Sequence, residues 1–311
     1  MCDGSHLSWR DLLIVQNVFI MNLALVVTTL GRIDSLRLLF DSLVGRLGPT
    51  DRLVVVAQRN LPGVEALATE FRGKSLPVDV TTSLPGAARG RNAGVALLTE
   101  DYDYLLAFPN DTTWFPEGTV EQLHALPEHF RVGALTVVDE YGPKFDLPPT
   151  GTTLDRWNVW SVIEMGILVR RSLFDAVTGF DPEIGTGATT PWQAGEATDF
   201  LLRLMRDGLT SDFAWQPPSL VVRGVSDAHG LSRRQRRHKL RSYSRGLGRL
   251  VTRWHYPLWW RLAFIVGGIA FGIRHRRTYE PSDGWWVFLG RVEGSLGRTL
   301  GPGVPQKAVT R

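Results

Sequence analysis

Short apolar runs alternate with amphipathic stretches through the first 140 residues of the chain. Residues 23–28 form a continuous apolar run rich in β-branched side chains, and residues 35–46 then repeat large apolar side chains at helical spacing. Further strands are predicted at 51–57, 77–81, 104–108 and 132–138, and further helices at 64–71, 91–98 and 119–126. Strands that are apolar on both faces and alternate with helices predict an α/β fold with a Rossmann-like, mostly parallel sheet flanked by helices.

The alternation continues in the second half with longer loops between the elements. A strand is predicted at 162–170, a helix at 172–177, a second helix at 196–206 and a last strand at 219–222. We therefore predict one α/β domain over residues 21–228. Ligands bind beyond the carboxyl ends of the strands in such sheets, so the residues that follow each strand are the candidates for function.

Charge is divided unevenly along the chain. Residues 1–229 contain 18 Lys and Arg against 28 Asp and Glu, whereas residues 230–279 contain 13 basic residues and no acid. An acidic body followed by a purely basic segment indicates that the two parts have different roles. The single cysteine, Cys2, excludes an intramolecular disulfide framework and is typical of a reducing compartment.

Residues 1–20 precede the first convincing strand. The stretch 12–21 is apolar, but Asp3 and Asp11 lie upstream of it and no small-residue cleavage site follows. A secretory signal peptide is therefore not predicted. Residues 1–20 are assigned as an N-terminal leader whose status the sequence leaves open.

A polar motif, Asn110-Asp111-Thr112-Thr113-Trp114, follows the apolar strand predicted at 104–108. A carboxylate at this point can hold a divalent cation that bridges a diphosphate. Asn and Asp are also favoured wherever a strand passes into a turn, so a structural role is the alternative.

A glycine-containing loop at 85–90 precedes the predicted helix that starts with Arg91 and Asn92. A helix N-terminus beside the guanidinium groups of Arg89 and Arg91 suits a diphosphate. The alternative is a loop that only caps the helix and leaves both arginines in solvent. Thr28 and Arg32 come directly after the first strand.

These segments resemble the family 2 glycosyltransferases, which have the GT-A fold, and in particular their bacterial exopolysaccharide-type members. Asn110-Asp111-Thr112, with Trp114 and Pro116, stands where the family has its Asp-X-Asp motif, although Asp111 is the one carboxylate there. Arg91-Asn92-Ala93-Gly94 is similar to the family's Arg-Asn-X-Gly segment. The resemblance implies a set of donor-binding residues: Thr28, Arg32, Arg89, Arg91, Asn92, Asn110 and Asp111.

Residues 179–199 resemble the family's acceptor loop and the start of the helix that follows it. There a carboxylate deprotonates the acceptor hydroxyl in an inverting displacement. Glu196 and Asp199 are three residues apart, on one side of the first helical turn, so the resemblance leaves the base open between them, with a preference for Asp199. Alternatively both acids complement the helix dipole. The same resemblance implies that Trp192 and Thr190 contact the acceptor, with Trp192 as a platform for a sugar ring.

The family also implies a divalent cation, Mg²⁺ or Mn²⁺. Asp111 and His229 are its predicted ligands in this chain, since His229 follows the last predicted strand, where relatives place a histidine near the metal or the phosphate. A lone histidine with no such role is the alternative.

Residues 229–311 are predicted to form a basic, Trp-rich helical tail that associates with a membrane. Its basic cluster at 233–239 precedes the apolar stretch 258–273, which is 16 residues long. A bilayer span needs about 20 apolar residues, so a peripheral or monotopic contact with an anionic inner leaflet is predicted. Nucleic-acid binding is the alternative for the cluster, but no nucleic-acid module accompanies it, and no nucleic-acid partner is predicted.

The resemblance as a whole implies an inverting transfer of sugar from a nucleotide-diphosphate sugar to a lipid-linked glycan acceptor at the cytoplasmic face of the cell membrane. Residues 21–140 would form the nucleotide-sugar half and residues 141–228 the acceptor half. A nucleotide-sugar-binding protein without turnover is the main rival. The prediction requires the segments around Asn92, Asp111 and Asp199 to meet in one cleft.

Overall fold

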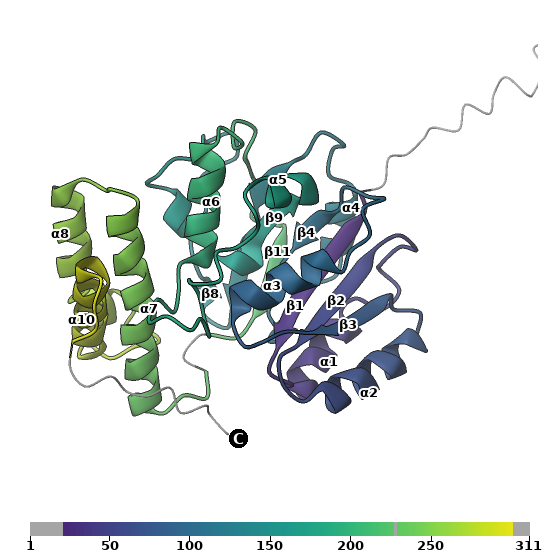
Figure 1. Cartoon of the computed structure of the whole chain (residues 1–311), viewed down its shortest axis with the longest axis horizontal. Coiled ribbons are helices and arrows are strands. Elements are labelled where there is room, and N and C mark those ends of the chain that lie inside the picture. The colour runs from purple at the N-terminus through teal and green to yellow at the C-terminus, as the bar shows by residue number, and fades with distance from the viewer. Residues whose placement is uncertain (1–20, 227–228, 301–311) are drawn as a thin grey trace, which may run out of the picture.

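The computed structural model describes residues 21–226 and 229–300 (Figure 1). The leader assigned to residues 1–20 lies outside the described residues. Within them, a seven-stranded sheet forms the centre of the molecule, with helices on both sides. The predicted α/β fold is therefore confirmed.

The central sheet has the strand order β10-β6-β9-β4-β1-β2-β3. Its parallel part consists of β1 (Leu23–Thr29), β2 (Arg52–Ala57), β3 (Val78–Thr82) and β4 (Leu105–Ala107). The remaining strands are β9 (Ile167–Arg170), β6 (Val132–Ala134) and β10 (Ala214–Trp215). Because β9 runs antiparallel to both β4 and β6, the sheet is mostly but not wholly parallel, as predicted.

The two faces of the sheet bury separate apolar clusters. Along β1, Ala24 and Val26 face one cluster while Leu25 and Val27 face the other, which explains why this strand reads as a continuous apolar run. The first cluster is covered by α3 (Ala87–Ala96), α5 (Arg171–Ala176) and α6 (Glu196–Arg206). The second is covered by α1 (Ile33–Asp41), α2 (Leu61–Arg72) and α4 (Thr119–His124).

A second, four-stranded sheet adjoins the central one. It consists of β5 (Thr113–Trp114), β11 (Val221–Gly224), β7 (Thr136–Asp139) and β8 (Gly142–Pro143). The register places Gly224 beside Thr113, so the segment that follows β11 starts next to the turn that contains Asp111. The single strand predicted at 132–138 is wrong, because the chain changes sheets between β6 and β7.

The strand predicted at 162–170 is also shorter than expected. Short 3-10 turns occupy Val159–Ser161 and Glu164–Gly166, and β9 begins only at Ile167. The backbone N–H of Leu135 donates to the carbonyl of Gly166 at 2.9 Å, so this segment still lies along the sheet.

The C-terminal part is helical, as predicted, and forms a layer beside α6 (Figure 1). Its helices are α7 (Arg233–Arg253), α8 (Leu258–Gly267), α9 (Phe271–Arg274) and α10 (Asp283–Leu296). A capping box starts α7, since the Ser232 hydroxyl accepts from the N–H of Gln235 and the Gln235 side chain accepts from the N–H of Ser232. Among the described helices, none is both long and apolar enough to cross a membrane.

Buried ion pairs join α7 to α10. Arg236 and Arg237 of α7 contact Asp283 at 2.8 and 3.2 Å, while Arg241 and Arg245 contact Glu293. Both carboxylates are fully buried. Much of the basic cluster that the sequence displays is thus neutralised within the chain rather than presented to a partner.

Candidate functional site

Arg91 lies at the centre of the candidate site. It belongs to α3 and is buried beyond the carboxyl ends of β1 and β4. Its Nη2 donates to Asn110 Oδ1 at 3.0 Å and lies 3.5 Å from Glu164 Oε1, while its Nη1 lies 3.5 Å from Glu196 Oε1. One guanidinium group therefore links four segments that are far apart in the sequence.

Glu196 is the titratable group with the most unusual environment at this edge. It is the first residue of α6, and its side chain is buried against Gly185. Burial, with repulsion from Glu164, raises the pKa of Glu196 to about 7, although Arg91 acts in the opposite direction. A carboxyl group with such a pKa can accept a proton at neutral pH.

Glu164 was not predicted as a site residue. It lies in the 3-10 turn before β9, and its Oε1 is 3.5 Å from Nη2 of Arg91, the nitrogen that also donates to Asn110. The signal in the sequence is an acidic residue within the apolar run 162–170, which indicates a carboxylate that points into the protein and has a partner there.

Asp199 lies one helical turn beyond Glu196 and has different partners. Its Oδ2 accepts from Arg203 Nε at 2.9 Å, and its Oδ1 accepts from the indole N–H of Trp254 at 3.0 Å. Arg253 Nε lies 3.8 Å away. Asp199 is fully buried in these contacts, so it faces the C-terminal helices, whereas Glu196 faces the Arg91 cluster.

Asp111 is also buried, and both of its oxygens are bound. The Thr29 hydroxyl donates to Oδ2 at 2.7 Å, and Arg32 donates to Oδ2 from Nε at 3.0 Å and to Oδ1 from Nη2. The Arg32 side chain itself is 60% exposed. Arg32 and Asp111, both predicted to bind the sugar donor, thus form a bidentate ion pair.

A divalent cation does not fit this arrangement of side chains. Asp111 is already neutralised by Arg32, and the Asn110 side-chain oxygen accepts from Arg91. His229 is 67% exposed, with its Nδ1 3.7 Å from Glu140 Oε1. No group of three or more His, Cys, Asp or Glu side chains in the described part of the chain is placed to hold a metal ion.

The Asn92 side chain forms hydrogen bonds to the backbone of Phe180. Its Nδ2 donates to the carbonyl of Phe180 at 2.7 Å, and its Oδ1 accepts from the N–H of Phe180 at 2.9 Å. The loop before α3 contacts the same region, because the N–H of Ala87 donates to the carbonyl of Thr186 at 2.8 Å. The two loops predicted to bind donor and acceptor are therefore in direct contact.

The other predicted donor residues lie around the start of α3. Arg89 is half-buried and donates to the carbonyl of Pro85 at 3.1 Å. Thr28, at the end of β1, lies so close to Gly90 that a Cβ there would overlap its side chain. Gln58, which the sequence did not single out, donates to the carbonyl of Gly86 at 2.8 Å and so helps to fix the loop before α3.

The predicted acceptor loop is organised by Gln193. This buried side chain accepts from the N–H of Gly187 at 2.9 Å and donates to the carbonyl of Ala188 at 2.9 Å. Thr190 donates its hydroxyl to the carbonyl of Glu183. Trp192 is partly exposed and lies under the Arg249 guanidinium, whose carbon is 5.5 Å from the ring centre.

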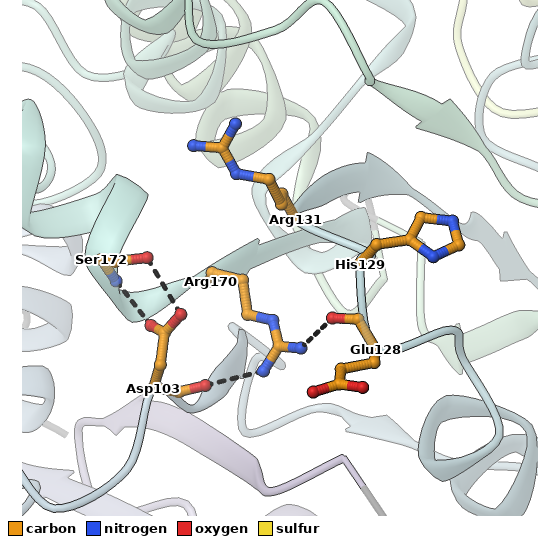
Figure 2. A pocket seen from close by; sticks show the side chains of 6 residues that line it. All are labelled: Asp103, Glu128, His129, Arg131, Arg170 and Ser172. Atoms are coloured by element: carbon orange, nitrogen blue, oxygen red, sulfur yellow. Dashed lines mark hydrogen bonds between the residues drawn. The ribbon is translucent and has the colours of Figure 1, made fainter. Parts of the chain in front are cut away.

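A separate hollow of about 440 Å³ lies at the opposite edge of the sheet (Figure 2). Arg170, at the carboxyl end of the antiparallel β9, lies beside the first residues of β4 and β6. Its guanidinium donates to the carbonyls of Phe130, Asp103 and Glu128 at 2.7–2.9 Å, so it ties loops together. This hollow is not at the edge where the predicted site residues gather.

Solved structures of glycosyltransferases share this architecture. The mannosyltransferase PcManGT from Pyrobaculum calidifontis, in complex with GDP-Man and Mn²⁺, has a TM-score of 0.58 at 10% identity, covering 89% of this chain and 87% of that one. S. aureus TarS 1–349 has a TM-score of 0.54 at 14% identity, covering 89% of this chain and 92% of that one. GalNAc-T7 with UDP, GalNAc and Mn²⁺ has a TM-score of 0.51 at 14% identity, covering 75% and 48%.

No protein-family model and no curated protein matches the sequence. At these identities the structural likeness establishes the fold. The chain has the GT-A-type α/β fold of glycosyltransferases, as the sequence predicted.

Proposed function

We propose that this protein is a glycosyltransferase that moves a sugar from a nucleotide-diphosphate sugar to an acceptor hydroxyl. One observation carries the proposal: at the carboxyl edge of a GT-A-type sheet, buried Arg91 connects α3, Asn110 after β4 and Glu196 at the start of α6. In open α/β sheets this edge is where ligands bind. Neighbouring structures solved with UDP-GlcNAc and GDP-Man support a nucleotide sugar as the donor.

The donor diphosphate is assigned to the surface around Arg89, near the α3 N-terminus and beside the acceptor loop, whose Thr186 carbonyl accepts from the N–H of Ala87. The positive end of the helix dipole favours an anion there, and Arg89 supplies a partly exposed guanidinium group. Arg32, which binds Asp111 in the turn after β4, supplies a second exposed guanidinium group. A diphosphate would thus meet cationic groups from two elements.

Glu196 is the general base in this proposal. Its carboxylate takes the proton of the acceptor hydroxyl while the hydroxyl oxygen forms a bond to the anomeric carbon and the bond from that carbon to the diphosphate oxygen breaks. Attack from the face opposite the leaving group inverts the anomeric centre. The raised pKa of Glu196 supports this role, and the occupied oxygens of Asp199 argue for a positioning role for that residue.

The solved structures of PcManGT, in complex with GDP-Man and Mn²⁺, and of GalNAc-T7, with UDP, GalNAc and Mn²⁺, support a divalent cation as a cofactor. The sequence predicted Asp111 and His229 as the ligands for Mg²⁺ or Mn²⁺ in this chain. Because Arg32 already neutralises Asp111, no step of the proposed transfer relies on a metal ion. The guanidinium group supplies positive charge beside the donor site in this arrangement.

The acceptor is proposed to be a lipid-linked glycan at the cytoplasmic face of the cell membrane, with Trp192 and Thr190 in its loop. Two rivals remain testable. A nucleotide-sugar-binding protein without turnover would bind the donor but neither transfer nor hydrolyse it. Nucleic-acid binding is less favoured, because Arg236, Arg237 and Arg241 form ion pairs with buried carboxylates.

A thermal-shift screen of UDP-, GDP- and dTDP-sugars, with and without Mn²⁺, tests the donor proposal. We expect one nucleotide class to raise the melting temperature of the protein, since binding to the folded state stabilises it. The positive donors then enter a transfer assay with membrane lipid extract. Absence of a shift with every donor would contradict the proposal, and a shift without transfer or hydrolysis would favour the binding protein.

A further inference from the structure

A row of large apolar side chains is exposed along α8 and into α9. They follow one another mostly at three- or four-residue spacing, and each is between 49% and 66% exposed. We name this surface the α8 ridge, and its members are Leu258, Trp259, Leu262, Val266, Ile269 and Ile273. Figure 1 shows α8 on the outer side of α7, away from the central sheet.

The opposite side of α8 is firmly packed. Trp260 stacks on Tyr256, with ring centres 4.5 Å apart, and on Phe264 at 5.2 Å. Trp160 contacts both Trp260 and Phe264 at 5.6–5.7 Å. The ridge is therefore the outward face of an anchored helix, so its exposure is built into the fold.

Basic side chains lie at one end of the ridge. Arg274, Arg276 and Arg277 are exposed, and no ion pair to any of them is found among the residues the structure describes. This contrasts with α7, where four arginines contact buried acids. Trp285, on α10, adds a further exposed aromatic side chain. Apolar, aromatic and unpaired basic groups together match the interface of an anionic bilayer.

The helical layer that carries the ridge also holds the predicted acceptor loop. At the end of α7, the indole N–H of Trp254 donates a hydrogen bond to Asp199. Arg253 Nη1 forms an ion pair with Asp181 Oδ2 at 2.7 Å. Nearer its start, the Tyr243 hydroxyl lies 3.0 Å from the Thr186 hydroxyl. Docking through α8 would therefore fix the position of the acceptor loop relative to the surface.

We propose that the α8 ridge inserts into the headgroup region of a membrane leaflet that contains anionic lipid, with Arg274, Arg276 and Arg277 on the headgroups. This anchors the protein as a monotopic membrane protein. The presentation of the acceptor loop to a lipid-linked substrate rests on the proposed function, whereas the docking itself does not. A nucleic acid would leave the apolar ridge unexplained, and a second copy of this chain would leave the three arginines unexplained.

Vesicle sedimentation of the full chain tests the proposal, with phosphatidylcholine vesicles that contain or lack one quarter phosphatidylglycerol. We expect binding to the anionic vesicles that weakens between 0.1 and 0.5 M NaCl, as screening of the arginines requires. The paired change Leu262→Ser and Val266→Ser should reduce the partition coefficient by about tenfold, because both side chains are exposed and lie on the ridge. Arg276→Gln with Arg277→Gln should weaken binding and remove most of its salt dependence.

Leu38→Ser is the matched control, since Leu38 is a similarly exposed leucine on α1 at the other side of the sheet. Unchanged binding by the ridge variant, or no binding by the wild-type chain, would overturn the proposal. So would a wild-type dimer that the ridge variant converts to a monomer without loss of vesicle binding. Glu196→Gln should bind vesicles like the wild type, so a failure of the catalytic proposal would leave this result intact.

Discussion

Three ionisable side chains meet in the candidate site: Arg91 and Glu196, which are buried, and Glu164, which is partly exposed. A single guanidinium group lies 3.5 Å from each carboxylate, so one positive charge faces two acids. If both acids were ionised, the cluster would carry a net negative charge in a poorly solvated place. Glu196 therefore keeps its proton until the pH approaches neutrality, in agreement with its pKa of about 7.

Removal of Glu164 should lower the pKa of Glu196, because the repulsion between the two carboxylates disappears. The ionised base would then be populated at lower pH. We predict that Glu164→Gln moves the acidic limb of the pH–rate profile of transfer down by roughly one pH unit. Wild-type activity should rise as the pH passes through about 7, since the carboxylate of Glu196 forms there.

Glu121→Gln is the control for this profile, because Glu121 is exposed on α4 and remote from the cluster. It should leave the limb where the wild type has it. An unmoved limb in Glu164→Gln would show that Glu196 does not set the pH dependence.

The ion pair between Arg32 and Asp111 leads to a prediction about Mn²⁺ affinity. If Arg32 competes with a cation for the carboxylate, Arg32→Gln should bind Mn²⁺ about tenfold more tightly than the wild type, a difference of ~1.4 kcal/mol. The bound ion can be counted directly by its paramagnetic resonance. Arg89→Gln, which lacks a contact with Asp111, serves as the comparison, and equal Mn²⁺ affinity in all three proteins would contradict the competition.

The identities of several site residues were accessible from the sequence, but their environments were not. Arg91, Asn110 and Glu196 were predicted and do meet, because Arg91 lies in the first half of α3, Asn110 follows β4 and Glu196 begins α6. The preference for Asp199 rested on the resemblance to the family, which cannot tell which acid contacts Arg203 and Trp254. Glu164 was missed because its role depends on a partner more than 70 residues away in the sequence.

At the scale of elements, close contact between α7 and α10 explains the glycines of both helices. A Cβ at Gly294 would overlap the carbonyl of Arg245, and one at Gly290 would overlap that of Arg241. The same close approach brings Asp283 and Glu293 onto the arginines of α7. The sequence predicted a basic helical tail. The packing of α7 on α10 shows that several of its arginines are neutralised by carboxylates of α10.

Gly294→Ala should therefore destabilise the protein, by about 1–3 kcal/mol in the free energy of unfolding, because the added methyl group has no space. Gly267→Ala is the matched change on α8, where the nearest atom to the new Cβ would be 3.9 Å away. That variant should be neutral or more stable, by up to ~1 kcal/mol, since alanine favours helix. Urea unfolding measures both, and equal stability of the two variants would contradict the close packing of α7 on α10.

At the scale of the whole molecule, the alternation of apolar runs and amphipathic stretches predicted the fold class correctly. Long strands buried on both faces, such as β1 and β2, produce a strong pattern. The second sheet escaped prediction because β5 and β8 are two residues long and produce no periodicity. The change of sheets between β6 and β7 also escaped prediction, because residues 132–138 are mainly apolar and predict a single strand.

The arrangement of the molecule joins the proposed chemistry to the proposed location. The loop before α3 touches the acceptor loop, the acceptor loop is held by α7, and α7 lies between that loop and the α8 ridge. A path of direct contacts therefore runs from the donor side of the site to the surface that is proposed to meet the membrane.

Sugar transfer by Glu196→Gln, measured with the donor identified in the thermal-shift screen and with membrane lipid extract as acceptor, tests the central claim most directly. The account predicts that the variant binds the donor as the wild type does, while its transfer rate falls by roughly 10²–10⁴-fold, since the account assigns the acceptor proton to the Glu196 carboxylate. Transfer by Glu196→Gln at the wild-type rate would contradict the account.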